Sequence, residues 1–261
     1  MTLSAESLRA LGAPTPARGR EPKVESRASE AARPAPTAVP PPTIDIRPSI
    51  SSTALTAKAK AVAEIRERAM QCVKCSHLAS TRKNVVFGVG NPDAELMFVG
   101  EAPGADEDIQ GEPFVGAAGQ LLTKMIQTMG LSRDQVYIAN ILKCRPDMPA
   151  GASGNRKPTA EEMQTCIPYL HAQIDVIQPK VLVALGGTAV EGLLQKSGIT
   201  KLRGQWHTYR GIPLMPTYHP AYLLRNQAMA EKRKVWEDLL AVMEKLGLTI
   251  TPKQRGFFLK S

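Results

Sequence analysis

The stretch from Glu95 to Thr128, ELMFVGEAPGADEDIQGEPFVGAAGQLLTKMIQT, carries the pattern that decides the fold. Its apolar run, Leu96 to Val99, is typical of a short buried strand. Gly100 to Gly104 ends this strand, because Gly and Pro interrupt β ladders and favour tight turns. A helical pattern begins at Ala117, with apolar residues on one side at Leu121, Leu122, Met125, Ile126 and Met129. A strand, a polar loop and a helix in this order place the loop at the carboxyl edge of a parallel sheet, where α/β proteins bind ligands.

The loop of this unit combines acidic residues with one large apolar side chain. Asp106, Glu107 and Asp108 precede Phe114, which stands between a proline and a Val-Gly pair. A phenyl ring in a polar loop has to be buried somewhere. It either caps the hydrophobic core or forms a flat wall for a flat ligand, and the residues alone leave both interpretations open.

The same succession of strand, loop and helix recurs about four times along the chain, which predicts an α/β sandwich with a largely parallel sheet. Later strands are expected at 136–142, 180–185 and 212–218. Helices are expected from Thr159, which has a capping-box pattern with Glu162, over 188–194 and over 230–246. The residues at the ends of the strands would then meet along one edge: Glu101, Asn140, Gly186 and His219.

The first part of the chain has a different composition from the rest. Nine of the 21 prolines fall within the first 60 residues, which hold hardly any aromatic residue. Such a segment buries too little apolar surface to offset the entropy of ordering. We therefore expect a disordered tail over 1–52, with a short helix over 3–11 as its one ordered candidate. A folded domain over 53–250 and a C-terminal tail over 251–261 would follow.

The net charge of +9 is compatible with a polyanionic partner such as nucleic acid. No apolar signal region opens the chain and no apolar run is long enough to span a membrane. These features predict an intracellular, cytoplasmic protein without a membrane partner.

The four cysteines are Cys72, Cys75, Cys144 and Cys166. In an intracellular chain a disulfide framework is not expected. A tetrathiolate site suits either Zn²⁺ or a [4Fe–4S] cluster, while incidental buried thiols or a redox dithiol are the alternatives. Spacing alone does not separate zinc from iron–sulfur.

Four motifs in order, GEAPGADED, GEPFVGAAGQLL, ANILKCRP and HPAYLLR, together with the cysteines, resemble the family 4 uracil-DNA glycosylases, the thermostable-type iron–sulfur branch of that superfamily. The match covers roughly residues 55–246. It implies a three-layer α/β/α sandwich around a four-stranded, mainly parallel sheet. It also implies a [4Fe–4S] cluster on Cys72, Cys75, Cys144 and Cys166, with a structural role that orders a loop facing the DNA.

The resemblance further implies roles for the residues of the carboxyl edge. Phe114 would stack on an everted uracil, Asn140 would pair with its edge, and His219 would lie near its O2. Glu107 would stand against C5 and exclude the methyl group of thymine. Residues of the HPAYLLR motif would bind DNA and wedge into the duplex, and an ordinary first helical turn is the alternative for these four: Tyr222, Leu223, Leu224 and Arg225.

One position departs from the better-known uracil glycosylases, which have Asp directly after the residue that corresponds to Glu101. Here Ala102 takes that place beside the substrate, so Glu101 is the substitute carboxylate for the attacking water. With Asn140 and His219 it completes the expected catalytic set. The loop 150–157 has no His, so ordinary turnover is expected rather than covalent trapping of DNA.

The function expected from this resemblance is removal of uracil from DNA by a monomer associated with the nucleoid, on single- or double-stranded substrate. Two rivals belong to other classes. The acidic loop, with Glu101, could hold Mg²⁺ for phosphoryl chemistry, or the protein could be a non-catalytic iron–sulfur partner of a polymerase.

Overall fold

The computed structural model describes residues 56–146, 148 and 154–259. The expected N-terminal tail, 1–52, and the short helix within it lie outside this range. Six strands form one sheet in the described part of the chain, in the order β1-β3-β2-β4-β6-β5. They are β1 (Val89–Gly90), β2 (Leu96–Gly100), β3 (Tyr137–Asn140), β4 (Val181–Leu185), β5 (His207–Tyr209) and β6 (Ile212–Thr217).

The four central strands, β3, β2, β4 and β6, are parallel, as the sequence predicts. The predicted strand count of four is corrected to six, because a short antiparallel strand pairs at each edge. β1 pairs with β3, and β5 pairs with β6. Both edge strands have at most three residues, which is too short to show as an alternating pattern in the sequence.

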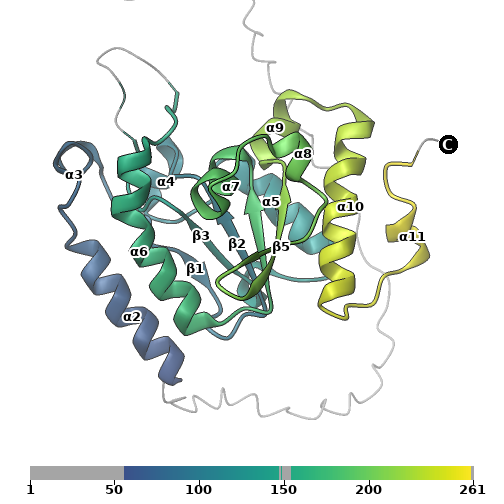
Figure 1. The fold of residues 1–261 in the computed structure, drawn as a ribbon, viewed down its shortest axis with the longest axis horizontal. Coiled ribbons are helices and arrows are strands. Elements are labelled where there is room, and N and C mark those ends of the chain that lie inside the picture. Colours follow the sequence, from purple (N-terminus) through teal and green to yellow (C-terminus); the bar gives the residue numbers. More distant parts are fainter. Residues whose placement is uncertain (1–55, 147, 149–153, 260–261) are drawn as a thin grey trace, which may run out of the picture. The chain divides into compact units, whose positions relative to one another are not determined.

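Helices cover both faces of the sheet, which confirms the three-layer α/β/α architecture (Figure 1). One face packs against α5 (Ala117–Thr128), α9 (Pro220–Arg225) and α10 (Met229–Lys245). The other packs against α6 (Ala160–Ile177) and α7 (Gly187–Leu194), with α2 (Ala57–Met70) lying outside α6. Successive strand residues alternate between the two cores: Leu96 and Phe98 belong to the first core, and Met97 and Val99 to the second.

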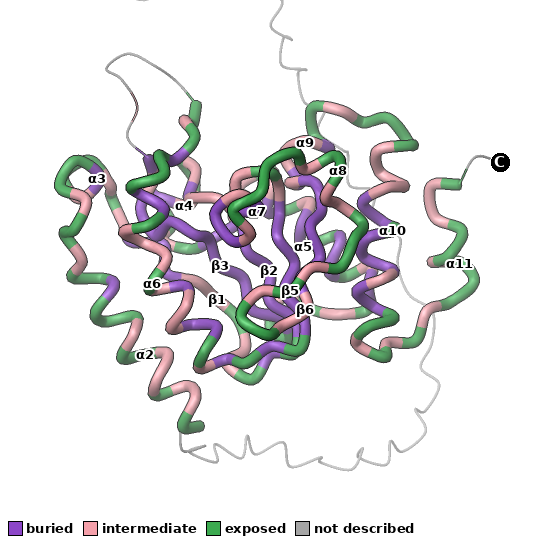
Figure 2. Tube along the Cα trace, viewed as in Figure 1, coloured by how far each residue is buried: buried purple, intermediate pink, exposed green. Residues whose placement is uncertain are grey.

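The sheet is the buried centre of the described residues, and the outer faces of the helices are exposed (Figure 2). All residues of β2, β3 and β4 are buried, as expected for parallel strands covered on both sides. No helix within the described ranges is both long and apolar enough to cross a membrane.

Local signals in the sequence fix several helix starts. Thr159 caps α6, where its hydroxyl accepts a hydrogen bond from the Glu162 amide at 3.1 Å. Pro220 is the first residue of α9, a position that needs no amide donor. The remaining short helices are α3 (Ser76–Thr81), α4 (Ala105–Gln110), the 3₁₀ turn η1 (Arg133–Gln135), α8 (Ile199–Leu202) and α11 (Pro252–Arg255).

Residues 251–259 pack back on the domain instead of leaving it. The indole Nε1 of Trp236 in α10 donates to the carbonyl of Gln254 at 2.6 Å, and its ring lies 5.6 Å from that of Phe257. The apolar Phe257 and Phe258 thereby extend the core on the α10 side.

Candidate active site at the carboxyl edge of the sheet

The ends of β2 and β3 lie side by side and continue to pair beyond the strands themselves. Gly100 is in register with Asn140. The Ile141 amide then donates to the Gly100 carbonyl at 3.0 Å, and the Leu142 amide to the Glu101 carbonyl at 3.1 Å. This pairing holds the loop after β2 against the end of β3, so Asn140 lies directly beside the GEAPG turn.

Asn140 carries a buried acceptor that has no donor. The residue is 2% exposed, and its Oδ1 is the one buried side-chain N or O atom among the described residues that lacks a hydrogen-bond partner. An unsatisfied buried acceptor costs about 1–3 kcal/mol. A buried acceptor without a donor is expected where a ligand supplies the missing hydrogen-bond donor.

The Asn140 amide and the Phe114 ring meet over Gly100. A Cβ atom on Gly100 would lie 2.3 Å from Asn140 Oδ1 and 2.6 Å from Phe114 Cζ. Both distances are shorter than any van der Waals contact, so only glycine admits the two side chains here. The end of β2 thus forms the floor on which an amide and an aromatic ring converge.

Phe114 is buried, with 6% of its surface exposed, and its φ of 55° is in the left-handed region that residues with a side chain rarely adopt. Its ring stacks on the His219 imidazole, with 5.5 Å between the centroids and 29° between the planes. The two rings touch, so no third ring fits between them. A flat ligand stacking on Phe114 has to displace the imidazole or use the part of the ring that it leaves open.

His219 is held in one tautomer at the start of α9. Its Nδ1 accepts a hydrogen bond from the Ala221 amide at 3.1 Å, so the proton of the neutral ring is on Nε2. Burial and, to a lesser extent, the nearby Arg225 cation lower the pKa of His219 to about 4, while Glu107 opposes this shift. At neutral pH the imidazole is therefore an uncharged Nε2–H donor.

A cleft of about 530 Å³ opens beside these residues. Its walls include five of the predicted site residues: Glu101, Ala102, His219, Tyr222 and Arg225. Tyr218, Asn155 and Arg156 also line it, and the sequence interpretation did not single them out. Phe114, Asn140 and Glu107 are not among the residues lining the cleft. Phe114 and Asn140 are buried beside its His219 wall.

Glu101 begins the loop after β2. Burial raises its pKa above the ordinary value, while a hydrogen bond with Thr188 and the charge of Lys157 oppose this shift. A carboxyl group in such a partly dry position can exchange a proton nearer to neutral pH than an exposed one.

The Glu107 carboxylate faces the backbone of the Phe114 loop. It accepts hydrogen bonds from the amides of Gly104 at 3.1 Å and of Val115 and Gly116 at 3.0 Å each. These three bonds occupy the carboxylate. The expected contact of Glu107 with a pyrimidine C5 stays a prediction.

The last four residues of the HPAYLLR motif, 222–225, lie in different environments on α9. Leu223 is 6% exposed and belongs to the core, whereas Leu224 is 41% exposed. The Tyr222 hydroxyl donates to Glu231 at 3.1 Å, and its ring lies 4.6 Å from that of Tyr218. Arg225 lines the cleft. Of the two leucines only Leu224 is placed to touch another molecule.

The four cysteines come from three segments and line one small cavity, together with Leu78, Arg82, Leu142, Glu162 and Thr165. Two of the sulfurs accept hydrogen bonds: Cys144 from the Arg82 guanidinium at 3.0 Å, and Cys166 from the Lys143 amide at 3.2 Å. Burial raises the pKa of Cys166 to about 11. Sulfurs at such positions become thiolates when a cationic group compensates their charge.

The donor set around this cavity consists of four cysteine sulfurs. Within the described residues no three His, Cys, Asp or Glu side chains come close enough to hold one metal ion. One zinc ion needs its four sulfurs about 2.3 Å from a single centre. A [4Fe–4S] cluster is likewise held by four thiolates, so the donor set is suitable for either group.

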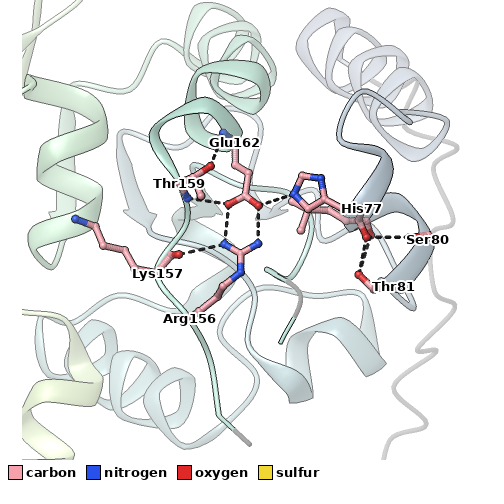
Figure 3. Close-up of polar contacts among 8 residues, drawn as sticks. His77, Ser80, Thr81, Arg156, Lys157, Thr159 and Glu162 are labelled. Carbon is pink, nitrogen blue, oxygen red and sulfur yellow. Dashed lines mark hydrogen bonds and ion pairs between the residues drawn. The ribbon is translucent and has the colours of Figure 1, made fainter. Parts of the chain in front are cut away.

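A buried carboxylate, that of Glu162, binds both Arg156 and His77 (Figure 3), and Arg156 lines the cleft. Glu162 of α6 is paired with Arg156 through two hydrogen bonds of 2.9 and 2.6 Å, and His77 of α3 lies 2.7 Å from the same carboxylate. The Arg156 guanidinium and these hydrogen bonds lower the pKa of Glu162 to about 2. The sequence predicted Glu162 only as a capping residue, because its partners are far apart in the chain.

A buried lysine, also missed from sequence, links β3 to the cysteines. Lys143 is 2% exposed, and its Nζ donates to the Asn140 carbonyl at 2.8 Å and to Gln173 Oε1 at 2.6 Å. Burial lowers the pKa of Lys143 to about 7. Gln173 in turn donates to the Phe87 carbonyl and the Tyr137 hydroxyl. The ANILKC motif holds a signal for this residue, since a lysine directly follows an apolar strand.

The acidic loop does not gather its carboxylates around a cation. Asp108 is buried and accepts from the amides of Lys83 at 3.0 Å and Asn84 at 3.3 Å. Glu107 is bound to three other amides. These amide hydrogen bonds engage two of the carboxylates that the rival magnesium site would use.

The fold and the site together define an α/β sandwich with a candidate binding cleft at the carboxyl edge of a parallel sheet. Residues 87–240 match the model of the uracil DNA glycosylase superfamily. The chain belongs to this superfamily.

Relatives with a more specific name extend over most of the described residues. The chain is 45% identical to the type-4 uracil-DNA glycosylase of Sulfurisphaera tokodaii, over 73% of this chain and 86% of the relative. It is 46% identical to that of Thermotoga maritima over 67% and 89% of the two chains, and 44% identical to that of Saccharolobus solfataricus over 67% and 81%.

Proposed function

We propose that this protein excises uracil from DNA by hydrolysing the N-glycosidic bond, leaving an abasic site and free uracil. The observation that carries this proposal is the donor-less Oδ1 of Asn140, buried beside the Phe114 ring at the sheet edge. An everted pyrimidine with an N3–H group would satisfy that atom and stack on that ring. The family and the type-4 relatives support the same activity.

Base selection follows from the hydrogen-bond pattern of the amide. Asn140 can accept from uracil N3–H and donate to O4 with one side chain. Cytosine presents an acceptor at N3 and donors at C4, so both pairs would be lost in a buried position. Extrusion of the base is required because an enzyme cannot reach the glycosidic bond of a stacked base.

His219 and the cleft would stabilise the departing base. Bond cleavage leaves negative charge on uracil, and a neutral imidazole that donates Nε2–H towards O2 stabilises this anion without first losing a proton. Arg225, whose charge already reaches His219, adds a positive field. Glu101, with its raised pKa, is the proposed acceptor of the proton from the water that attacks the sugar, and Ala102 beside it leaves room for that water.

DNA would cross the cleft next to α9. Arg225 would contact the phosphates, and the exposed Leu224 would fill the gap that the everted base leaves. Leu223 would support this turn from the core, and Tyr222 would support it through its hydroxyl contact with Glu231. We propose that the protein works as a monomer on nucleoid DNA, single- or double-stranded, inside the cell.

Exclusion of thymine is proposed for Glu107. Its carboxylate is fixed to the backbone beside Phe114, so it cannot move aside for a methyl group without breaking those bonds.

We propose a [4Fe–4S] cluster as the cofactor, held by Cys72, Cys75, Cys144 and Cys166. The cluster would supply structural cross-linking between α3, the end of β3 and α6. The cluster would not contact the substrate, because the four cysteines line a separate cavity that shares no residue with the substrate cleft. Anaerobically purified protein is expected to be brown with broad visible absorbance, and a colourless zinc-loaded protein would refute this cofactor.

The test of the function is incubation with a single-stranded oligonucleotide that contains one uracil, followed by alkaline cleavage of abasic sites. We expect strand scission with the wild type. Asn140→Ala is expected to lose about 10²–10³-fold in rate, in the range found for removal of one preorganised donor, and Phe114→Ala also loses rate. Gln127→Ala, on the exposed side of α5, is the control and keeps wild-type activity.

Two outcomes would contradict the proposal. Full activity of Asn140→Ala would remove its role in reading the base. Binding of the uracil oligonucleotide without any abasic product would favour the non-catalytic DNA-binding protein instead.

A further inference from the structure

The loop that carries Phe114 is fixed from two sides by an oppositely charged pair of side chains. We propose that Arg133 and Glu107 form a clamp on the backbone around Phe114, and that this clamp positions the ring for stacking on the everted base. The inference rests on the proposed function for the identity of that base. Arg133 is thereby assigned as a positioning residue that acts through Phe114.

Arg133 holds the carbonyl side of the loop. From the 3₁₀ turn η1 it reaches back along the chain, where Nη2 donates to the Pro113 carbonyl at 3.0 Å and Nη1 to the Phe114 carbonyl at 3.3 Å. Nη1 also donates to the Thr123 hydroxyl of α5 at 3.2 Å. A guanidinium has a planar array of donors that can reach two carbonyls and a hydroxyl at once, which a lysine ammonium does not reproduce.

Glu107 holds the amide side of the same loop. One carboxylate oxygen accepts from both the Val115 and Gly116 amides at 3.0 Å. The other accepts from Gly104 at 3.1 Å and ties the clamp to the start of α4. Arg133 therefore binds the carbonyls of the peptide groups on both sides of Phe114. Glu107 binds the amide of the group after Phe114 and that of the next group, so carbonyls and amides each meet the charge that their dipole favours.

Phe114 needs this clamp because its backbone is strained. A φ of 55° is unfavourable for any residue with a side chain. Gly119 in the first turn of α5 contributes further, since a Cβ there would lie 1.8 Å from the Phe114 carbonyl oxygen. The strained carbonyl is thus enclosed by the helix on one side and by Arg133 on the other, which aims the ring across Gly100 towards Asn140 and His219.

Strain held in this way at a site is expected when it pre-organises a functional group. If the clamp is released, the Phe114 backbone can relax to an ordinary conformation and its ring leaves Gly100. The loss would affect catalysis through one side chain. Arg133 should therefore matter only while Phe114 is present, which distinguishes a positioning role from a general structural one.

The experiment is a double-mutant cycle on uracil excision with Arg133→Met and Phe114→Ala. We expect Arg133→Met alone to lower kcat/KM by about 10–100-fold, the scale of a small misplacement at a reacting site. In the Phe114→Ala background the same change should cost about 2-fold or less, because interacting residues are not additive. Arg133→Lys, which keeps the charge without the planar array, should recover less than half of the loss. Arg210→Met, which removes an exposed arginine bound to Asp175, is the matched control.

A second measurement reads the loop without any reaction. Hydrogen exchange of the Val115 and Gly116 amides should be faster by about 10-fold or more in Arg133→Met, while amides of β4 keep their protection. Equal losses from Arg133→Met in both backgrounds, or unchanged exchange at residues 115 and 116, would overturn the inference. Absence of excision by the wild type would instead refute the proposed function, and the exchange measurement would still decide on the clamp.

Discussion

The Phe114 loop and the cysteine-bearing segments are both irregular backbone near the carboxyl end of the sheet, yet they are held in different ways. Around Phe114 the chain supplies every contact itself: Arg133 and Glu107 bind the peptide groups, and Gly119 packs against them. Around the cysteines the protein supplies four thiols that line a cavity, with a few hydrogen bonds to their sulfurs. What would bind those thiols to one another is a cofactor.

The comparison separates a loop that the polypeptide holds by its own bonds, the Phe114 loop, from segments whose order would depend on a bound cofactor, the cysteine-bearing segments. Strain at Phe114 is balanced by local bonds, so it should persist whenever the domain is folded. The cysteine segments include residues 71–75 and α3, and their side-chain contacts with the rest of the domain include His77 with Glu162 and Arg82 with Cys144. Their order should depend on the cluster. The predictions below break or sharpen this contrast, from the largest expected effect to the smallest.

The largest effect is expected in the cysteine-bearing segments, from Cys166→Ala. Loss of one thiolate should abolish the visible absorbance of the cluster and lower Tm by about 10 °C or more, since losing a structural metal site costs several kcal/mol. Calorimetry and absorbance measure both changes. Gln164→Ala, an exposed neighbour on α6, is the control and should change neither.

Hydrogen exchange of the same Cys166→Ala protein tests the contrast itself. Residues 71–82 should lose protection, while the Val115 and Gly116 amides keep it. Loss of protection at both places to the same extent would show that the Phe114 loop also depends on the cofactor.

Lys143 is hydrogen-bonded to both Asn140 and Cys166, and replacing it with Met is expected to have the second largest effect. The change leaves the Asn140 carbonyl and Gln173 Oε1 without their buried donor, which costs about 1–3 kcal/mol for each group. Removing a buried amine recovers part of this cost. We expect a net destabilisation of about 2 kcal/mol in urea unfolding. Lys124→Met, on the exposed side of α5, should stay within about 0.5 kcal/mol of the wild type, and an equally small change in Lys143→Met would contradict the bridging role.

The contrast also explains how far the sequence can predict this molecule. The parallel strands and their helices could be predicted, because hydrophobic periodicity and caps such as Thr159 are local signals. The meeting of Glu101, Asn140 and His219 at one edge could be predicted too, since parallel strands end on the same side. The edge strands β1 and β5 could not, because two or three residues carry too little pattern.

The residues that position the site could not be predicted from local sequence patterns. Arg133 binds carbonyls 19 and 20 positions earlier in the chain, and Glu162 binds His77 from a distance of 85 positions. Nothing in the neighbouring sequence marks such partners. Glu107 was singled out, but its three backbone hydrogen bonds could not be read from the motif. The sequence thus indicates which side chains lie at the carboxyl edge of the sheet better than it indicates what positions them.

His219, which stacks on Phe114, should have a charge state that is set by the protein around it and not by the cofactor. Its pKa is lowered to about 4 from an ordinary 6.5 by burial and by Arg225. The folded protein therefore binds fewer protons than the unfolded chain between these values, so this group's contribution to stability is complete above about pH 6.5 and is lost as the pH falls towards 4.

An NMR titration of His219, assigned with His219→Asn, measures this directly. We expect no titration of the ring between pH 8 and 5 in the wild type, and a pKa that moves up towards 6.5 in Arg225→Gln. Lys232→Gln, on α10, should leave the titration unchanged. A wild-type midpoint near 6.5 would mean that the imidazole is solvated and that its neutral-donor role is wrong.

The smallest effect is expected from Leu224→Ala, whose side chain is 41% exposed on α9. Stability should stay within about 0.5 kcal/mol of the wild type. If Leu224 fills the gap left by an everted base, excision from duplex DNA should fall by about 5-fold, because unstacking and unpairing the base cost a few kcal/mol only in the duplex. Excision from single strands should change by less than about 2-fold. Leu223→Ala gives the opposite pattern, since its side chain is 6% exposed: it should lose about 2–4 kcal/mol of stability without a selective loss on duplex. If Leu224→Ala lowers the excision rate equally on both substrates, Leu224 makes a general DNA contact. Eversion of the base would then have to occur without a side chain that fills the gap in the duplex.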